Sequence, residues 1–312
     1  GTFELLNIPS ISTGIAENWI IEGNPKSAIG LSLIALLIIF TLIIFEKFSR
    51  RKSKRWSENP ASQDSQGWEL NKFRAFLAII SSLFPPIFSF GIPCFWVLLN
   101  IDQIQKGLSE ELITLSLRTI SLGFITALIT MIFSLVLSLA NRPNKSLLLK
   151  LISNLAGIGY AIPGTVIALS LISISSSKFN FIAICLLIWG YLVRFLTISK
   201  GSIDSSLERI SPSLDEAALG LGESWIGTVK RIHLPLLKGP IFVGSLLVFV
   251  DTIKELPITF LLRPFDFDTL SVRIYQYAGD ERMVEAILPA IFIMALGLIA
   301  SITLIPSLEK KN

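Results

Sequence analysis

The stretch SLDEAALGLGESWIGTVKRIHLP, residues 213–235, lies between two long apolar runs and determines how the whole chain is interpreted. Ser213 followed three positions later by Glu216 has the form of a capping box, so we expect a helix to begin at Ser213. The residues that follow favour helix, and Gly222 is a natural stop or hinge. The pattern therefore predicts a short helix that ends in a glycine turn.

A second short helix is expected from Glu223 toward Arg231. Pro235, and then the Gly-Pro pair at 239–240, should end it and turn the chain back toward the next apolar run. The small residues of the first helix and of its turn would let another backbone or a large side chain approach closely. An ordinary helical hairpin with a good cap is the alternative, because alanine and glycine are common at such spacing.

The complete motif is more specific than its parts. Glu216-Ala217-Ala218, three residues, Gly222, nine residues and Ile232-His233-Leu234-Pro235 resemble the cytoplasmic EAA loop of the membrane-spanning subunits of ABC importers. In that family the loop folds as two short helices that dock in a groove on a separate ATPase subunit. The resemblance implies that the following residues couple this chain to an ATPase: Ser213, Glu216, Ala217, Ala218, Gly222, Ile232, Leu234 and Pro235.

Composition indicates a polytopic membrane protein. Hydrophobic residues make up 52% of the 312 residues and charged residues 16%, against about 25% charged in a typical soluble domain, and the mean hydropathy is +0.67. The basic residues lie beside the apolar runs, so the net charge of +4 does not indicate nucleic-acid binding. We expect an all-α fold with about seven spans, each near the roughly 20 residues that a bilayer requires: 28–45, 76–99, 112–140, 147–173, 179–198, 240–262 and 284–304.

The distribution of lysine and arginine predicts the orientation. The heaviest basic cluster, at 47–55, follows the first span and should be cytoplasmic. Alternation from there places the EAA-like loop and the C-terminus in the cytoplasm, and the N-terminus outside a bacterial inner membrane. No cofactor, metal or catalytic residue is expected, because His233 is the only histidine and no P-loop motif occurs; ATP and Mg would be held by the partner ATPase.

The two ends of the chain echo each other weakly. Ser12, Ile15 and Gly23-Asn24 align with Ser271, Ile274 and Gly279-Asp280, each group followed by an apolar span. We therefore expect a truncated first permease half, with an extra signal-anchor helix as the alternative. The expected domains are an outside loop and last span at 1–46, a basic and polar cytoplasmic linker at 47–72, a six-span permease domain at 73–307 with its EAA loop at 199–239, and a cytoplasmic tail at 308–312.

Three further stretches resemble the fused two-half permeases of ferric-iron-type importers: GYAIPG at 159–164, FVDTIKELP at 249–257 and LRPFDFDTL at 262–270. The resemblance implies that the last six spans form a type I ABC-importer (MetI-like) bundle and that the substrate is ferric iron. Related fused permeases carry thiamine, and single-half relatives carry sulfate, molybdate or polyamines, so these substrates remain alternatives.

Charges inside the sixth span are costly. Asp251, Lys254 and Glu255 lie within 240–262, and each costs about 2.5–3.5 kcal/mol at the centre of a membrane helix. Asp251 and Lys254 lie three residues apart on one helical face and can therefore pair. Such charges either line a translocation pathway or form an internal salt bridge. Proline at mid-span likewise indicates either a packing kink or a substrate contact. The candidate pathway or gate residues are Tyr160, Pro163, Gly164, Asp251, Lys254, Glu255 and Pro257.

The sequence thus predicts the permease subunit of an ATP-driven, binding-protein-dependent importer. Its expected partners are a cytoplasmic ABC ATPase dimer, an extracytoplasmic substrate-binding protein, a second permease half and membrane lipid, without nucleic acid. A secondary transporter driven by an ion gradient is the alternative from another class, and would need no ATPase. A non-functional fragment is a third interpretation.

Overall fold

The computed structural model describes residues 8–51, 70–102, 110–143, 146–174 and 180–309. Within these ranges every regular element is a helix, which confirms the predicted all-α fold. Five helices are long and apolar enough to cross a membrane, and the number reaches seven if each of two sharply bent helix pairs is one span. Most of the predicted linker at 47–72 and of the tail at 308–312 lies outside the described residues.

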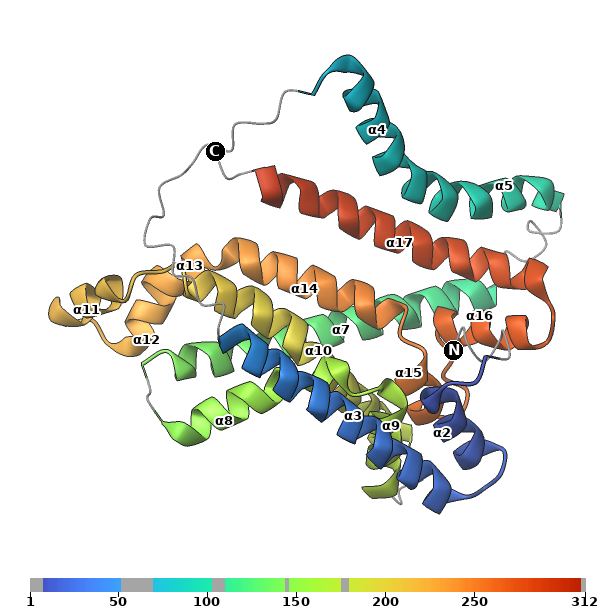
Figure 1. The fold of residues 1–312 in the computed structure, drawn as a ribbon, viewed down its shortest axis with the longest axis horizontal. Helices are drawn as coiled ribbons and strands as arrows, with labels where there is room; N and C mark the ends of the chain where they lie inside the picture. Colours follow the sequence, from blue (N-terminus) through green and yellow to red (C-terminus); the bar gives the residue numbers. More distant parts are fainter. Residues whose placement is uncertain (1–7, 52–69, 103–109, 144–145, 175–179, 310–312) are drawn as a thin grey trace.

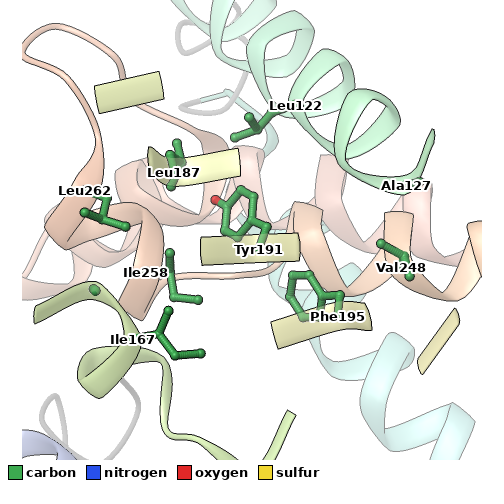
Figure 2. Packing of buried hydrophobic residues seen from close by; sticks show 10 residues of the cluster. Leu122, Ala127, Ile167, Leu187, Tyr191, Phe195, Val248, Ile258 and Leu262 are labelled. Carbon is green, nitrogen blue, oxygen red and sulfur yellow. The ribbon is translucent and has the colours of Figure 1, made fainter. Parts of the chain in front are cut away.

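Three helices form the centre of the molecule (Figure 1). Helices α7 (Glu110–Asn141), α10 (Asn180–Leu207) and α14 (Lys238–Ile253) pack against one another along their lengths. Figure 2 shows how Tyr191 and Phe195 of α10 lie in the middle of this core. The Tyr191 hydroxyl lies 2.5 Å from Thr259 Oγ1 of α15 (Pro257–Leu262), so the buried phenol has a partner.

Helix α7 is continuous over 32 residues, and the chain is fastened to it at both ends. Near its start, Arg118 Nη1 donates to the Asp266 carbonyl at 2.7 Å, and Thr119 Oγ1 accepts from the Leu270 amide at 2.9 Å. Directly after its end, Arg142 contacts the loop that follows α10. The helix therefore links the segment before α16 (Leu270–Gly279) to the opposite end of the bundle.

The two ends of the chain share one helical layout. Helix α2 (Ile11–Ile20) has ten residues, is capped by Ser10 and is followed by the 27-residue α3 (Pro25–Arg51). Helix α16 also has ten residues, is capped by Thr269 and is followed by α17 (Met283–Glu309), again with 27 residues. The weak sequence echo thus corresponds to two hairpins of matching length, and α2 and α3 pack on α9 (Gly164–Ile174).

The helices of the predicted second span, 76–99, are exposed along their length. Helices α4 (Lys72–Pro86), η1 (Ile87–Gly91) and α5 (Ile92–Leu99) run on from one another, with a π turn directly after Pro85 and Pro86. The described part of the chain buries none of its residues. Because the segment carries no charged residue after Arg74 and is largely apolar, its surface suits lipid or another apolar helix.

Two predicted spans are broken rather than continuous. The chain runs through α8 (Leu147–Ala156) and the short η2 (Gly159–Ala161), then turns by 113° into α9. The predicted span 240–262 is interrupted at 254–256, between α14 and α15. The prolines at positions 163 and 257 stand directly before or at the start of the second helix of each pair, where a missing N–H does no harm.

Candidate functional site

The first helix of the EAA-like loop is α11 (Pro212–Gly220), and it starts earlier than predicted. Ser211 is its N-cap, and the Ser211 hydroxyl accepts from the Ser213 amide at 3.3 Å. The predicted capping box of Ser213 and Glu216 is therefore wrong, and the Glu216 side chain is exposed. Pro212 explains the difference, because its fixed φ favours the first helical position.

Gly222 ends α11 as predicted. Its φ of +83° is left-handed, its amide donates to Leu219 O at 3.0 Å, and the Glu223 amide donates to Ala218 O at 3.0 Å. These two bonds and the positive φ are those of a Schellman motif. A Cβ at 222 would meet nothing within 4 Å, so the backbone angle, not crowding, requires glycine here.

The second helix is longer than predicted. It begins at α12 (Trp225–Thr228), where the Ser224 hydroxyl accepts from the Gly227 amide at 3.1 Å, and passes through the π turn η3 (Val229–His233) into α13 (Leu234–Leu236). The expectation that Pro235 ends the helix is wrong, because Pro235 lies in the first turn of α13, where its missing N–H is tolerated. The chain bends by 70° into α14, whose first turn holds the Gly-Pro pair at 239–240.

The residues of the loop divide into an outward and an inward set. Glu216, Ala217 and Pro235 are exposed, whereas Ala218 is buried and Ile232 and Leu234 are half-buried. Sequence reasoning missed the outward apolar side chains around the glycine turn, which are Leu219, Leu221 and Ile226. Leu221 is 90% exposed. Contiguous exposed apolar side chains are typical of surfaces that bind another protein or a membrane.

The inward side of the loop is charged. Arg142 Nε lies 2.5 Å from Asp215 Oδ2, and Asp215 Oδ1 lies 3.0 Å from His233 Nε2, within ion-pair distance although not aligned as a hydrogen bond. His233 is fully buried, with its ring centroid 5.5 Å from that of Trp225. Burial lowers the pKa of His233 below its usual value, an effect that Asp215 partly opposes. Sequence reasoning missed this network, since its members are far apart in the chain.

The two breaks in the membrane helices meet at a cavity of about 350 Å³. Five of the predicted pathway residues line it, namely Tyr160, Asp251, Lys254, Glu255 and Pro257. Its remaining lining residues are Arg194, Phe195 and Leu256. Residues predicted from two distant stretches of sequence thus come together in one place.

Arg194 is the charged residue of this cavity that the sequence analysis did not identify. Its Nε lies 3.6 Å from Glu255 Oε2, and its guanidinium carbon lies 5.6 Å from the centroid of the Tyr160 ring. The Glu255 side chain is only 7% exposed, and its Oε1 also accepts from the Ile258 amide at 3.3 Å at the start of α15. The pair therefore joins α10 to the break before α15.

Gly164 makes room for that pair. A Cβ at 164 would lie 2.6 Å from Arg194 Nη1 and 3.0 Å from Glu255 Oε1, so any side chain would displace one of them. A Cβ at Gly159 would overlap the carbonyl oxygen of Val193, which brings η2 directly onto the backbone of α10. The space beside Gly164 is thus filled by side chains of Arg194, Glu255 and Ile258, and Pro163 supplies the break beside it.

The predicted pair of Asp251 and Lys254 is also present, with Lys254 Nζ 2.8 Å from Asp251 Oδ1. The expectation that it lies inside the bundle is wrong for the lysine, which is 58% exposed in the described chain. The helix ends at Ile253, so Lys254 leaves the helical surface and points away from the core. The two residues pair at the rim of the cavity instead of forming an internal salt bridge.

A second cavity, of about 460 Å³, lies beside the first and shares the Tyr160 side chain as part of its wall. Polar groups of Asn154, Thr197 and Lys200 face it. On α10, Arg194, Thr197 and Lys200 follow one another at intervals of three residues, and neighbours at this spacing share a helical face. The polar lining therefore continues along α10 from one cavity to the other, past the Tyr160 ring.

Comparison with known proteins identifies the family of the chain. Residues 137–311 match the family model "Binding-protein-dependent transport system inner membrane component". The chain is 24% identical over 295 residues to the Fe(3+)-transport system permease protein FbpB 2 of Haemophilus influenzae, with 92% of this chain and 58% of that protein covered. The chain thus spans a little over half the length of this curated relative.

A solved structure shows the same fold. A bacterial ABC transporter involved in the import of alginate superposes with a TM-score of 0.59 at 16% identity, over 77% of this chain and 96% of that one. The same type of transporter in complex with its pentasaccharide-bound periplasmic protein gives a TM-score of 0.49 at 15% identity, over 75% and 94%. The predicted resemblance to ABC-importer permeases is confirmed, and the chain belongs to the family of binding-protein-dependent transport system inner membrane components.

Proposed function

We propose that this chain is the permease subunit of an ATP-driven importer and that the loop from α11 to α13 docks on a separate cytoplasmic ATPase dimer. The observation that carries the proposal is the shape of this loop. The Schellman turn at Gly222 turns apolar side chains outward at its tip, while charged side chains fasten its inner side to the bundle. Such a surface gains free energy, roughly 25 cal/mol per Å² of apolar area, when a partner covers it.

The proposed orientation places this loop in the cytoplasm. Basic residues near it, such as Lys230 and Lys238, agree with the excess of positive charge on that side of the membrane. The N-terminus and α16 then lie outside, where a substrate-binding protein would reach them, and the C-terminus lies in the cytoplasm. ATP and Mg²⁺ would be bound by the ATPase dimer.

We further propose that the two cavities belong to the translocation pathway and that Tyr160 separates them as a gate. Irregular backbone at membrane depth is tolerated where it is buried in protein or lines a cavity, and transporter sites often lie where broken helices meet. The breaks before α9 and before α15 support this role here, together with charges that would be unfavourable in lipid. A second permease half would close the opposite side of this pathway.

Ferric iron is the substrate that we favour, because the relative with 24% identity is named as an Fe(3+)-transport permease. The first cavity carries two cationic and two anionic side chains, so it favours neither sign of charge. Nowhere in the described ranges do three His, Cys, Asp or Glu residues gather as a metal site. Substrate choice would therefore rest with the binding protein, and thiamine, polyamines or oxyanions are the alternatives.

The proposal is tested by expressing the full protein with a candidate ATPase and a candidate substrate-binding protein of this importer class. We expect the ATPase to copurify, the iron-loaded binding protein to stimulate its activity, and vesicles to take up radioactive iron only with ATP. Uptake driven by a proton or sodium gradient without ATP would identify a secondary transporter instead. If this chain supported ATP-driven uptake as the sole permease subunit, the proposed second permease half would not be required.

Neutralising Asp251 and Lys254, the ion pair at the rim of the first cavity, tests the proposed pathway. Because Lys254 is largely exposed, Lys254→Met should cost only about 0.2–1 kcal/mol of stability, as exposed ion pairs do, yet it should lower uptake strongly. Asp251→Asn combined with Lys254→Met should not restore uptake. Expression level and uptake are measured for both, with Arg282→Gln as control, since Arg282 makes a similar exposed pair with Glu285. Restored uptake in the double variant would make the pair structural.

A further inference from the structure

Arg142 fastens three parts of the chain at once. Its Nη1 donates to the Leu207 carbonyl at 2.7 Å and its Nη2 to the Ile210 carbonyl at 2.9 Å, while its Nε contacts Asp215 of α11 at 2.5 Å. The residue itself stands directly after α7. The end of α7, the end of α10 and the start of α11 are thus joined through one planar, permanently charged group.

The second helix of the loop contacts the same carboxylate, that of Asp215. Asp215 Oδ1 lies 3.0 Å from His233 Nε2, without the alignment of a hydrogen bond, and the His233 ring packs against Trp225, so the contacts reach both η3 and α12. His233 has no exposed surface, and burial, opposed in part by Asp215, holds its pKa below the usual value. The His233 ring is thus held by packing against Trp225 and by its closeness to the Asp215 carboxylate.

These contacts are not the only attachment of the loop to the bundle. Leu237, which follows α13, is fully buried in an apolar cluster with Met131, Leu139, Ile203 and Leu207. That cluster anchors the base of the loop through hydrophobic burial. The polar network adds a second attachment, between the two loop helices and the ends of α7 and α10, which would hold the angle of the helical hairpin.

We propose that Arg142, Asp215 and His233 are positioning residues that make the loop move with α7 and α10 as one body. This inference rests on the proposed function, since it assumes that an ATPase displaces the loop. A hairpin free to swing about Leu237 would absorb such a displacement at its base. Held by the network, the hairpin transmits the displacement to the two central membrane helices.

The first test measures the angle of the loop directly. Spin labels are placed at Leu221→Cys, on the exposed tip, and at Gly201→Cys, where a Cβ meets nothing within 4 Å, with Cys94 and Cys185 replaced by serine. We expect a narrow distance distribution that broadens in Asp215→Asn and in Arg142→Lys. Arg231→Gln is the control, because its ion pair with Glu223 stays within the loop, and it should leave the distribution unchanged.

The second test measures coupling in the full transporter, as substrate taken up per ATP hydrolysed. Asp215→Asn and Arg142→Lys should still copurify with the ATPase, but the ratio should fall severalfold. Unchanged label distances, or broadened distances with an unchanged ratio, would overturn the inference and leave the docking role intact. If the unsubstituted protein does not bind the ATPase at all, the proposed function fails instead, which the copurification shows before any variant is made.

Discussion

Gly222→Leu is expected to abolish ATP-driven uptake while the protein still inserts into the membrane. A residue with a Cβ in the left-handed region costs roughly 1–2 kcal/mol, and φ at Gly222 is +83°. The leucine would either open the turn between the loop helices or project from the tip that we expect to meet the ATPase. Uptake, stimulated ATPase activity and the amount of protein in the membrane are measured together, and normal uptake would overturn the docking assignment.

Matched variants separate the two reasons for this effect. Gly220, two residues earlier, also has open space at its Cβ position but lacks a positive φ. Gly220→Ala should therefore be nearly neutral, whereas Gly222→Ala should reduce uptake and Gly222→Asn should restore part of it, since asparagine tolerates the left-handed region. Equal losses in both alanine variants would show that the partner surface, not the backbone angle, excludes a side chain.

Arg194→Met is expected to cause the largest loss of stable protein in the membrane. It would leave the Glu255 carboxylate, 7% exposed, without its cationic partner, and removing one member of a buried pair typically costs about 3–5 kcal/mol. Arg194→Met combined with Glu255→Gln should restore expression, because no uncompensated charge remains. The measurement is the thermal stability of the purified protein in detergent, followed by uptake in vesicles.

Gly164→Ala should imitate part of that loss without removing any charge, because its Cβ would lie 2.6 Å from Arg194 Nη1. Gly297→Ala, in α17, is the control, since a Cβ there meets nothing within 4 Å. If the double variant of Arg194 and Glu255 recovers expression but not uptake, the pair acts in the pathway. If Arg194→Met alone is as stable as the unsubstituted protein, the pair does not hold the two helices together.

The sequence predicted those features that depend on local chemistry. Gly222 was identified as a helix stop because few residues accept a left-handed backbone, and Pro163 and Pro257 marked the two breaks because proline cannot continue a helix. The start of α11 was misplaced because a Ser-x-x-Glu pattern at Ser213 competes with Pro212, whose rigid ring fixes the first helical position. Both outcomes follow from backbone preferences over a few residues.

What the sequence did not reveal depends on contacts between distant residues. Arg194 stands alone in an apolar run, where a single cation near a helix end resembles one that extends to the membrane surface. Only the fold brings it to Glu255. Arg142 and Asp215 are 73 positions apart, and nothing near either residue indicates the other. The exposure of Lys254 likewise follows from the end of α14 at Ile253, which the continuous hydropathy of 240–262 conceals.

The unbroken course of α7 has a thermodynamic consequence. From Arg118 to Arg142 it spans about 36 Å at 1.5 Å per residue, which exceeds the roughly 30 Å of hydrocarbon. Its two ends hold the segment before α16 and the loop that carries Gly222. In the orientation proposed above, these are two binding surfaces, one outside and one inside the membrane, which the continuous helix α7 connects. Linkage between two sites is reciprocal. If the loaded binding protein raises the affinity of the ATPases for nucleotide, nucleotide must raise the affinity for the loaded binding protein by the same factor.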